Sequence, residues 1–218
     1  KQRSRDFKLR SKLRAVNTAS LTTAVAAYSP VQRADDAYFL SLSSPQVASR
    51  EGERRVLKFL VLFSGTGSVE QKLHELYPNA EVVSIDICPR FHPTHCVAIE
   101  DWANERHVSN YTKYRTSYFD MIWASPPCTE YSQAKSTGVR DLKAADRRVA
   151  AALKIISGSK PTYWFIENPT SGDPYGLQYR RVMQGWSQYK HLCSYCHYGT
   201  RYRKHTTIWT KVPDLQLQ

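Results

Sequence analysis

The chain has 218 residues, a formal net charge of +12 and five cysteines. This length suits one domain with a hydrophobic core, and the basic balance favours an anionic partner such as nucleic acid. An odd number of cysteines without a visible signal peptide argues against a disulfide framework, and the most apolar stretch, at 56–63, is too short to span a bilayer.

Residues 1–54 differ in texture from the rest of the chain. They begin with the basic run KQRSRDFKLRSKLR and continue with small, weakly apolar residues. We expect a basic N-terminal extension at 1–54 and a globular domain at 55–218. The extension could equally be an arm that contacts nucleic acid or a solvated leader.

From residue 55 onward, apolar runs typical of strands alternate with helical patterns. Strands are predicted at 56–63, 80–86, 95–99, 118–124 and 162–168, and helical patterns cover 71–77 and 139–157. The segments 191–199 and 205–211 are expected to close the sheet as an antiparallel pair. This alternation predicts an α/β fold with a mostly parallel sheet that is covered by helices on both faces.

A glycine-rich turn, Ser64-Gly65-Thr66-Gly67, connects the first predicted strand to the first helix. Its glycines let the backbone approach a ligand closely, and the helix N-terminus adds a favourable field. Asp86 ends the next strand, where a carboxylate can accept hydrogen bonds from the ribose of a nucleotide-like cofactor. The alternatives are a plain connection for the turn and a cap or turn residue for Asp86. Together the two features favour cofactor binding.

Cys128 follows a pair of prolines in the stretch ASPPCTEYSQA, directly after the fourth predicted strand. The prolines restrict the backbone, and ligands of parallel sheets bind beyond the carboxyl ends of the strands. A thiol at this place could act as a nucleophile if cations or a helix N-terminus stabilise its thiolate. The alternative is an inert core cysteine, but the polar Thr129 and Glu130 that follow argue against burial.

Glu167 and Asn168 end the fifth predicted strand, in the stretch WFIENP. Because this strand is expected to neighbour the fourth, the carboxyl group of Glu167 would lie beside Cys128 at one edge of the sheet. It could then share or donate a proton. The alternative is an ordinary carboxylate at a strand end.

The stretches LFSGTGS, SID, ASPPCTEYSQA, FIENP and TRYRK have the order and spacing found in the cytosine-5 DNA methyltransferases, which use S-adenosylmethionine. The chain resembles this family from Leu57 to Lys211, and the Pro-Pro-Cys and Glu-Asn elements are the most specific parts. The resemblance implies a Rossmann-like S-adenosylmethionine-dependent methyltransferase fold with an antiparallel C-terminal strand. It also identifies 55–218 as the catalytic domain.

The resemblance further implies the roles of single residues. Cys128 would add to carbon 6 of cytosine, Glu167 would hydrogen-bond or protonate ring nitrogen 3, and carbon 5 would take the methyl group. Arg201 or Arg203 would contact the carbonyl group of the base, although Gly199 stands where the family has glutamine. The residues implied for cofactor binding are Phe63, Ser64, Gly65, Thr66, Gly67, Asp86, Ile87, Asp101 and Pro127.

Three interpretations of the activity stay open: methylation of DNA, the same chemistry on RNA, and a catalytically weak nucleic-acid-binding module that needs a partner. DNA ranks first because the Pro-Pro-Cys and Glu-Asn pattern is the DNA type in this family. We see no target-recognition region before Gln218, so such a region could lie beyond Gln218, come from a partner or be absent. We expect no membrane association and a nuclear or cytoplasmic location.

Two clusters offer zinc-type ligands, but zinc ligands usually come as separated pairs rather than as one compact run. We therefore predict no metal site. The clusters are Cys88, His92, His95 and Cys96, and His191, Cys193, Cys196 and His197.

Overall fold

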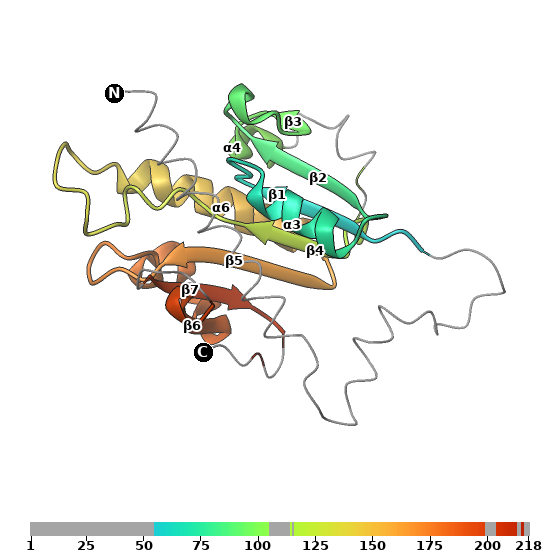
Figure 1. Ribbon diagram of the computed structural model, residues 1–218. Helices are drawn as coiled ribbons and strands as arrows, with labels where there is room; N and C mark the ends of the chain where they lie inside the picture. The colour runs from blue at the N-terminus through green and yellow to red at the C-terminus, as the bar shows by residue number, and fades with distance from the viewer. Residues whose placement is uncertain (1–54, 105–113, 115, 199–203, 213–214, 216–218) are drawn as a thin grey trace, which may run out of the picture.

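One sheet of seven strands, in the order β3-β2-β1-β4-β5-β7-β6, organises the chain (Figure 1). The computed structural model describes residues 55–104, 114, 116–198, 204–212 and 215. The basic extension expected at 1–54 lies outside these residues.

Five neighbouring strands of the sheet run parallel, which brings their carboxyl ends to the same edge. In spatial order they are β3 (His95–Cys96), β2 (Glu81–Asp86), β1 (Lys58–Leu62), β4 (Met121–Ala124) and β5 (Tyr163–Pro169). The last strand in the chain, β7 (His205–Thr210), runs antiparallel to both β5 and β6 (Lys190–Ser194). The predicted mostly parallel sheet with an antiparallel C-terminal strand is therefore confirmed.

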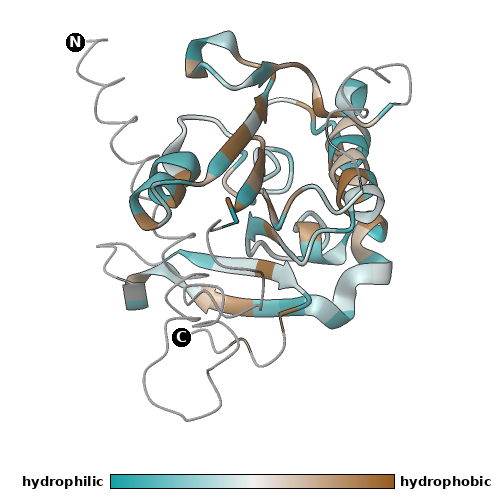
Figure 2. Cartoon of the chain, turned by 90° about the vertical axis from the view of Figure 1, so that its right-hand side faces the viewer, coloured by the Kyte–Doolittle hydropathy of each residue, from teal (hydrophilic) through white to brown (hydrophobic). Residues whose placement is uncertain are grey.

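Both faces of the sheet are buried, as the apolar runs predicted. Successive residues of β1 alternate between two core clusters, with Phe59 and Val61 in one and Leu60 and Leu62 in the other. The helix α3 (Ser68–Leu76) packs with the first pair. The second pair packs with α4 (Ile99–Trp102) and α6 (Leu142–Ser159). Figure 2 shows brown, hydrophobic stretches along the central strands and teal residues over outer loops and helix turns.

The helix α6 starts at a capped position, because the Asp141 side chain accepts a hydrogen bond from the backbone N–H of Ala144 at 2.8 Å. Its apolar stripe, at helical spacing, includes Ala145, Val149 and Ile156 and faces the core. Two 3₁₀ segments, η3 (Leu177–Tyr179) and η4 (Arg181–Tyr189), follow β5 and pack on the same side.

The strand predicted at 95–99 is wrong in its second half. β3 ends at Cys96, and Ile99 already belongs to α4. Two acidic residues in the first turn favour this short helix, and Ile99 and Trp102, three positions apart, bury one face against the core. A segment of so few residues is too short for its hydrophobic period to show where the strand changes to a helix.

Candidate functional site

The predicted site residues gather at the carboxyl edge of the parallel strands. The turn after β1 and the end of β2 form one half of this region. The ends of β4 and β5 form the other half, next to it in the sheet. Parallel sheets bind ligands beyond this edge, so both halves stand where the topology expects a site.

The turn after β1 adopts the left-handed backbone that its glycines permit. Gly65 has a φ of 54° and Gly67 a φ of 73°, and Phe63 also has a positive φ of 59°. No atom lies within 4 Å of the position that a Cβ of Gly67 would occupy. The backbone is therefore open there, and a cofactor can approach it closely.

Asp86 ties this turn to β2. One carboxylate oxygen accepts a hydrogen bond from the N–H of Gly65 and the other accepts one from the N–H of Cys88, both at 2.8 Å. Asp86 is thus a turn residue, as the alternative interpretation held. Each oxygen keeps a second lone pair, so the carboxylate can still accept a ribose hydroxyl.

The remaining predicted cofactor residues lie on three different segments that follow β2, β3 and β4. Ile87, directly after β2, is 70% exposed, which is unusual for an apolar residue next to a buried strand. Asp101 is exposed on α4, and Pro127 is exposed in the loop after β4. An open glycine turn, a carboxylate and an uncovered apolar side chain suit the ribose and adenine of S-adenosylmethionine.

Glu70 is an acid beside this turn that sequence reasoning missed. It lies in the first turn of α3, close to the buried Ser64 and Ser84. Burial raises its pKa from an ordinary value of 4.5 to about 7, although hydrogen bonds partly oppose this, and the nearby Asp86 adds to the rise. Among the described residues, its Oε2 atom has no hydrogen-bond partner.

The loop after β4 is fastened on both sides of Cys128. Before it, the buried amide of Asn168 on β5 donates a hydrogen bond to the carbonyl of Pro126 at 2.9 Å. After it, the N–H groups of Tyr131 and Ser132 donate to the carbonyl of Cys128 at 3.0 and 2.9 Å. These bonds fix the backbone on both sides of Cys128 and so hold its thiol in place. Of the two prolines before it, Pro126 is buried and Pro127 is exposed.

Cys128 itself is half-buried, which corrects the expectation of an unburied thiol. Burial raises the pKa of the Cys128 thiol and the negative charge of Glu167 raises it further, while the Lys204 ammonium group lowers it. The free protein therefore holds this group as a thiol near neutral pH.

Glu167 is 5% exposed and contacts two side chains from the antiparallel part of the sheet. The hydroxyl of Tyr195 donates to its Oε1 at 3.0 Å, and Nζ of Lys204 lies 3.4 Å from the same oxygen. Lys204 also lies over the Tyr195 ring, 4.8 Å from its centroid. Lys204 therefore pairs with Glu167 and also interacts electrostatically with Cys128.

Sequence reasoning missed Lys204 and Tyr195. It assigned the cation to Arg201 or Arg203, which lie outside the described residues together with Gly199. The only signal for Lys204 was its place directly after TRYR, before β7. Pairing of β7 with β5 brings that position to Glu167, and no local pattern encodes this pairing.

A second hydrogen-bond network connects the loop after β4 to α6 and to Arg180. The hydroxyl of Tyr131, which is 1% exposed, donates to Asp146 on α6 at 3.1 Å. The same carboxylate accepts hydrogen bonds from two nitrogens of Arg180, and the shortest of these bonds is 2.7 Å. The turn that carries Cys128 is therefore linked to both α6 and the start of η4.

The described residues offer neither a metal cluster nor a membrane-spanning helix. No group of three or more His, Cys, Asp or Glu side chains is placed to hold a metal ion there. No described helix is long and apolar enough to cross a membrane.

Comparison with known proteins gives a family match and a set of distant structures. The sequence model for the C-5 cytosine-specific DNA methylase family matches residues 57–171, which include Asp86, Cys128 and Glu167. A protein of Frog virus 3 (isolate Goorha), described as a probable DNA (cytosine-5)-methyltransferase, is 27% identical over 174 residues. That alignment covers 72% of this chain and 71% of the viral protein.

Two solved structures are similar to this chain at low sequence identity and with low TM-scores. The plantazolicin methyltransferase BamL, solved in complex with a triazolic desmethylPZN analog and SAH, is 12% identical over 96% of this chain and 90% of its own, with a TM-score of 0.48. An E. coli prophage protein is 16% identical over 71% of this chain, with a TM-score of 0.44. The chain spans less than half of the prophage protein, 46% of its length.

Proposed function

Since this chain belongs to the C-5 cytosine-specific DNA methylase family, whose cofactor is S-adenosylmethionine, we propose that it methylates carbon 5 of cytosine in DNA through a covalent adduct with Cys128. The observation that carries the proposal is the meeting of Cys128, Glu167 and Lys204 at adjacent strand ends. The family match supports the reaction class, and this cluster supports the mechanism.

The proposed reaction begins when Cys128 gives its proton to the Glu167 carboxylate and its sulfur bonds to carbon 6 of the cytosine. Glu167 then donates this proton, or a hydrogen bond from it, to ring nitrogen 3, so negative charge does not build up on the ring. When bound, S-adenosylmethionine supplies the electrophilic methyl group that carbon 5 takes. Carbon 5 then gives its proton to a base, nitrogen 3 returns its proton to Glu167, and the thiolate leaves.

The surrounding residues hold these groups rather than react. Asn168 fixes the loop before Cys128, and the Tyr195 hydroxyl orients one oxygen of Glu167. Lys204 favours the thiolate and keeps Glu167 in place. Arg201 and Arg203 remain candidates for contact with the carbonyl group of the base. A reactive thiol recessed in this way can reach a cytosine only after the base leaves the stack.

The cofactor would lie against the turn after β1. We propose that the cofactor approaches the protein backbone closely at Gly65 and Gly67. Asp86 would accept hydrogen bonds from the ribose hydroxyls, and Ile87 would cover the adenine. Phe63, Ser64, Thr66, Asp101 and Pro127 would line the remainder. The positive φ angles of Gly65 and Gly67 and the exposure of Ile87 support this assignment.

Trapping on duplex DNA that carries 5-fluorocytosine tests the proposal. Fluorine cannot leave as a proton does, so a working cysteine stays bonded to the base in the presence of cofactor. We expect a denaturation-resistant complex that Cys128→Ser abolishes. The matched control is Cys96→Ser, because Cys96 is an exposed thiol that could form adventitious adducts.

The same experiment separates the alternative substrates. A complex that Cys128→Ser leaves intact would refute the covalent mechanism. Trapping on a matched RNA but not on DNA would assign the chemistry to RNA. Intact cofactor binding without a complex on either polymer would indicate a binding module that needs a partner for catalysis.

A further inference from the structure

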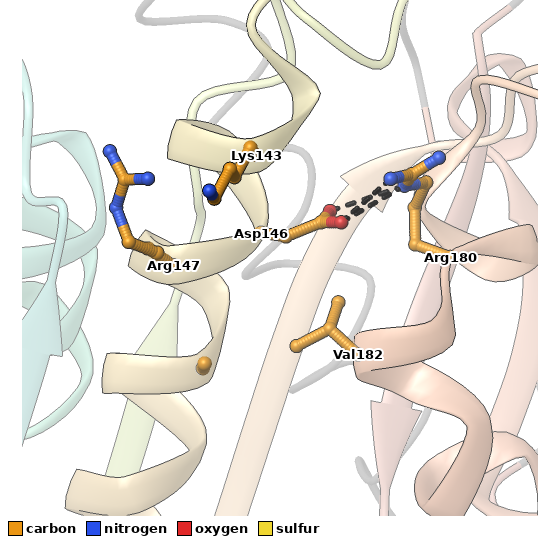
Figure 3. A pocket seen from close by; sticks show the side chains of 6 residues that line it. Lys143, Asp146, Arg147, Arg180 and Val182 are labelled. Atoms are coloured by element: carbon orange, nitrogen blue, oxygen red, sulfur yellow. Dashed lines mark hydrogen bonds and ion pairs between the residues drawn. The ribbon is translucent and has the colours of Figure 1, made fainter.

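An open pocket of about 430 Å³ lies between α6 and the start of η4, outside the reacting groups. Its walls are formed by Lys143, Asp146, Arg147 and Ala150 from α6 and by Arg180 and Val182 opposite them. Figure 3 shows Lys143 and Arg147 projecting from α6, while Arg180 reaches across to Asp146. The lining has no aromatic residue, so it does not suit a flat apolar ligand.

The charges in this pocket favour an anion. The lining carries three cations and one carboxylate, and Asp146 already accepts hydrogen bonds from Arg180 and Tyr131. The ion pairs between described residues include neither Lys143 nor Arg147. Because these two side chains are one helical turn apart, their mutual repulsion is relieved when an anion lies between them.

The pocket is also connected to the proposed nucleophile. Asp146 holds the Tyr131 hydroxyl, and the Tyr131 N–H bonds to the carbonyl of Cys128. The pocket is therefore linked by hydrogen bonds to the same turn that would receive the base. Lys143 lies in the first turn of α6, directly after the loop that Cys128 begins.

We propose that Lys143 and Arg147 bind backbone phosphates of the DNA strand whose cytosine enters the site. This inference rests on the proposed function, because the substrate sets the class of anion. Both side chains are exposed, as a surface that follows a phosphodiester backbone requires. A contact of this kind positions the polymer without reading its sequence. It would let the chain hold DNA through α6.

The test measures binding of fluorescent duplex DNA by anisotropy over a range of salt concentrations. Each neutralised phosphate contributes about 0.9 to the slope of log affinity against log salt. We expect the double variant Lys143→Gln and Arg147→Gln to reduce the magnitude of that slope by about 1.8. In turnover it should raise KM for DNA and leave kcat unchanged, because neither side chain touches the reacting atoms.

The matched control is Lys190→Gln with Lys211→Gln. It also removes two exposed positive charges, but at the opposite edge of the sheet, where β6 starts and β7 ends. An unchanged slope in the pocket variant, or an equal change in the control, would overturn the proposal. A pocket-dependent heat of binding with inorganic phosphate as strong as that with DNA would assign the pocket to a free anion instead.

These outcomes are independent of the test of the chemistry. Binding is measured without cofactor and needs no cysteine, so it can be repeated in a Cys128→Ser background. A pocket-dependent slope without any trapped adduct would refute the proposed function alone. A trapped adduct with a pocket-independent slope would refute the phosphate site alone.

Discussion

Replacing Glu70 by glutamine should stabilise the protein at alkaline pH. Glu70 lies beside the buried Ser64 and Ser84, and burial raises its pKa from 4.5 to about 7. The unfolded chain therefore ionises this carboxyl group at lower pH than the folded protein does. Stability is lost as pH rises from about 4.5 to about 7, and the cost is complete above that range.

The magnitude follows from the two pKa values. A shift from 4.5 to about 7 corresponds to a cost of about 3 kcal/mol for the fully ionised group. Linkage places about 1.4 kcal/mol of this at pH ~5.5 and nearly all of it at pH ~8. Glutamine has nearly the same shape and no charge. The stability advantage of Glu70→Gln should therefore grow by about 2 kcal/mol between these two pH values.

Urea unfolding at both pH values, without cofactor, measures this difference. The control is Glu75→Gln on the same helix, where the carboxylate is exposed and pairs with Lys72 at 3.0 Å. That variant should lose about 0.5 kcal/mol at most. A free-energy difference for Glu70→Gln that does not change with pH would refute the assignment of a raised pKa to this group.

Three further predictions concern the two halves of the site. Lys204→Met should shift the pH profile of adduct formation to higher pH and slow it near neutrality, because removal of the cation leaves burial and Glu167 to raise the pKa of Cys128 unopposed. Stopped trapping reactions at several pH values measure this shift. Tyr131→Phe should lower the trapping rate about tenfold, equal to ~1.4 kcal/mol, and leave affinity for S-adenosylhomocysteine unchanged, because it frees the turn from Asp146. Gly67→Ala should cost about 1 kcal/mol and weaken cofactor binding in calorimetry, because its φ of 73° strains any residue with a Cβ.

Each of these variants has a matched control. Lys211→Met removes a charge at the other end of β7 from Lys204, and an equal shift there would contradict a local effect of Lys204. Gly138→Ala has the same backbone problem, with a φ of 76° and no atom within 4 Å, but it lies in the loop after Cys128. It should lose similar stability and keep cofactor affinity. A Tyr131→Phe variant that loses cofactor binding and turnover in parallel would indicate general unfolding.

The sequence by itself indicated which segments form the parallel strands, in chain order, and which residues lie at their carboxyl ends. Apolar runs mark strands locally, and glycine or proline after a run fixes where each ends. Gly65, Gly67, Asp86, Cys128 and Glu167 were found in this way, each next to a predicted strand. The brief strand at 95–99 was misjudged in length because a run of so few residues has no clear period.

Only the tertiary structure decided what surrounds those residues. Lys204 and Tyr195 reach Glu167 from positions 37 and 28 residues away in the chain. Arg180 reaches Asp146 across 34 residues, and Glu70 on α3 is close to Ser64 and to Ser84 of β2. Such contacts follow from which strands pair and which helix covers them. Local propensity does not predict which strands pair or which helix covers them, because the packing of the whole sheet determines this arrangement.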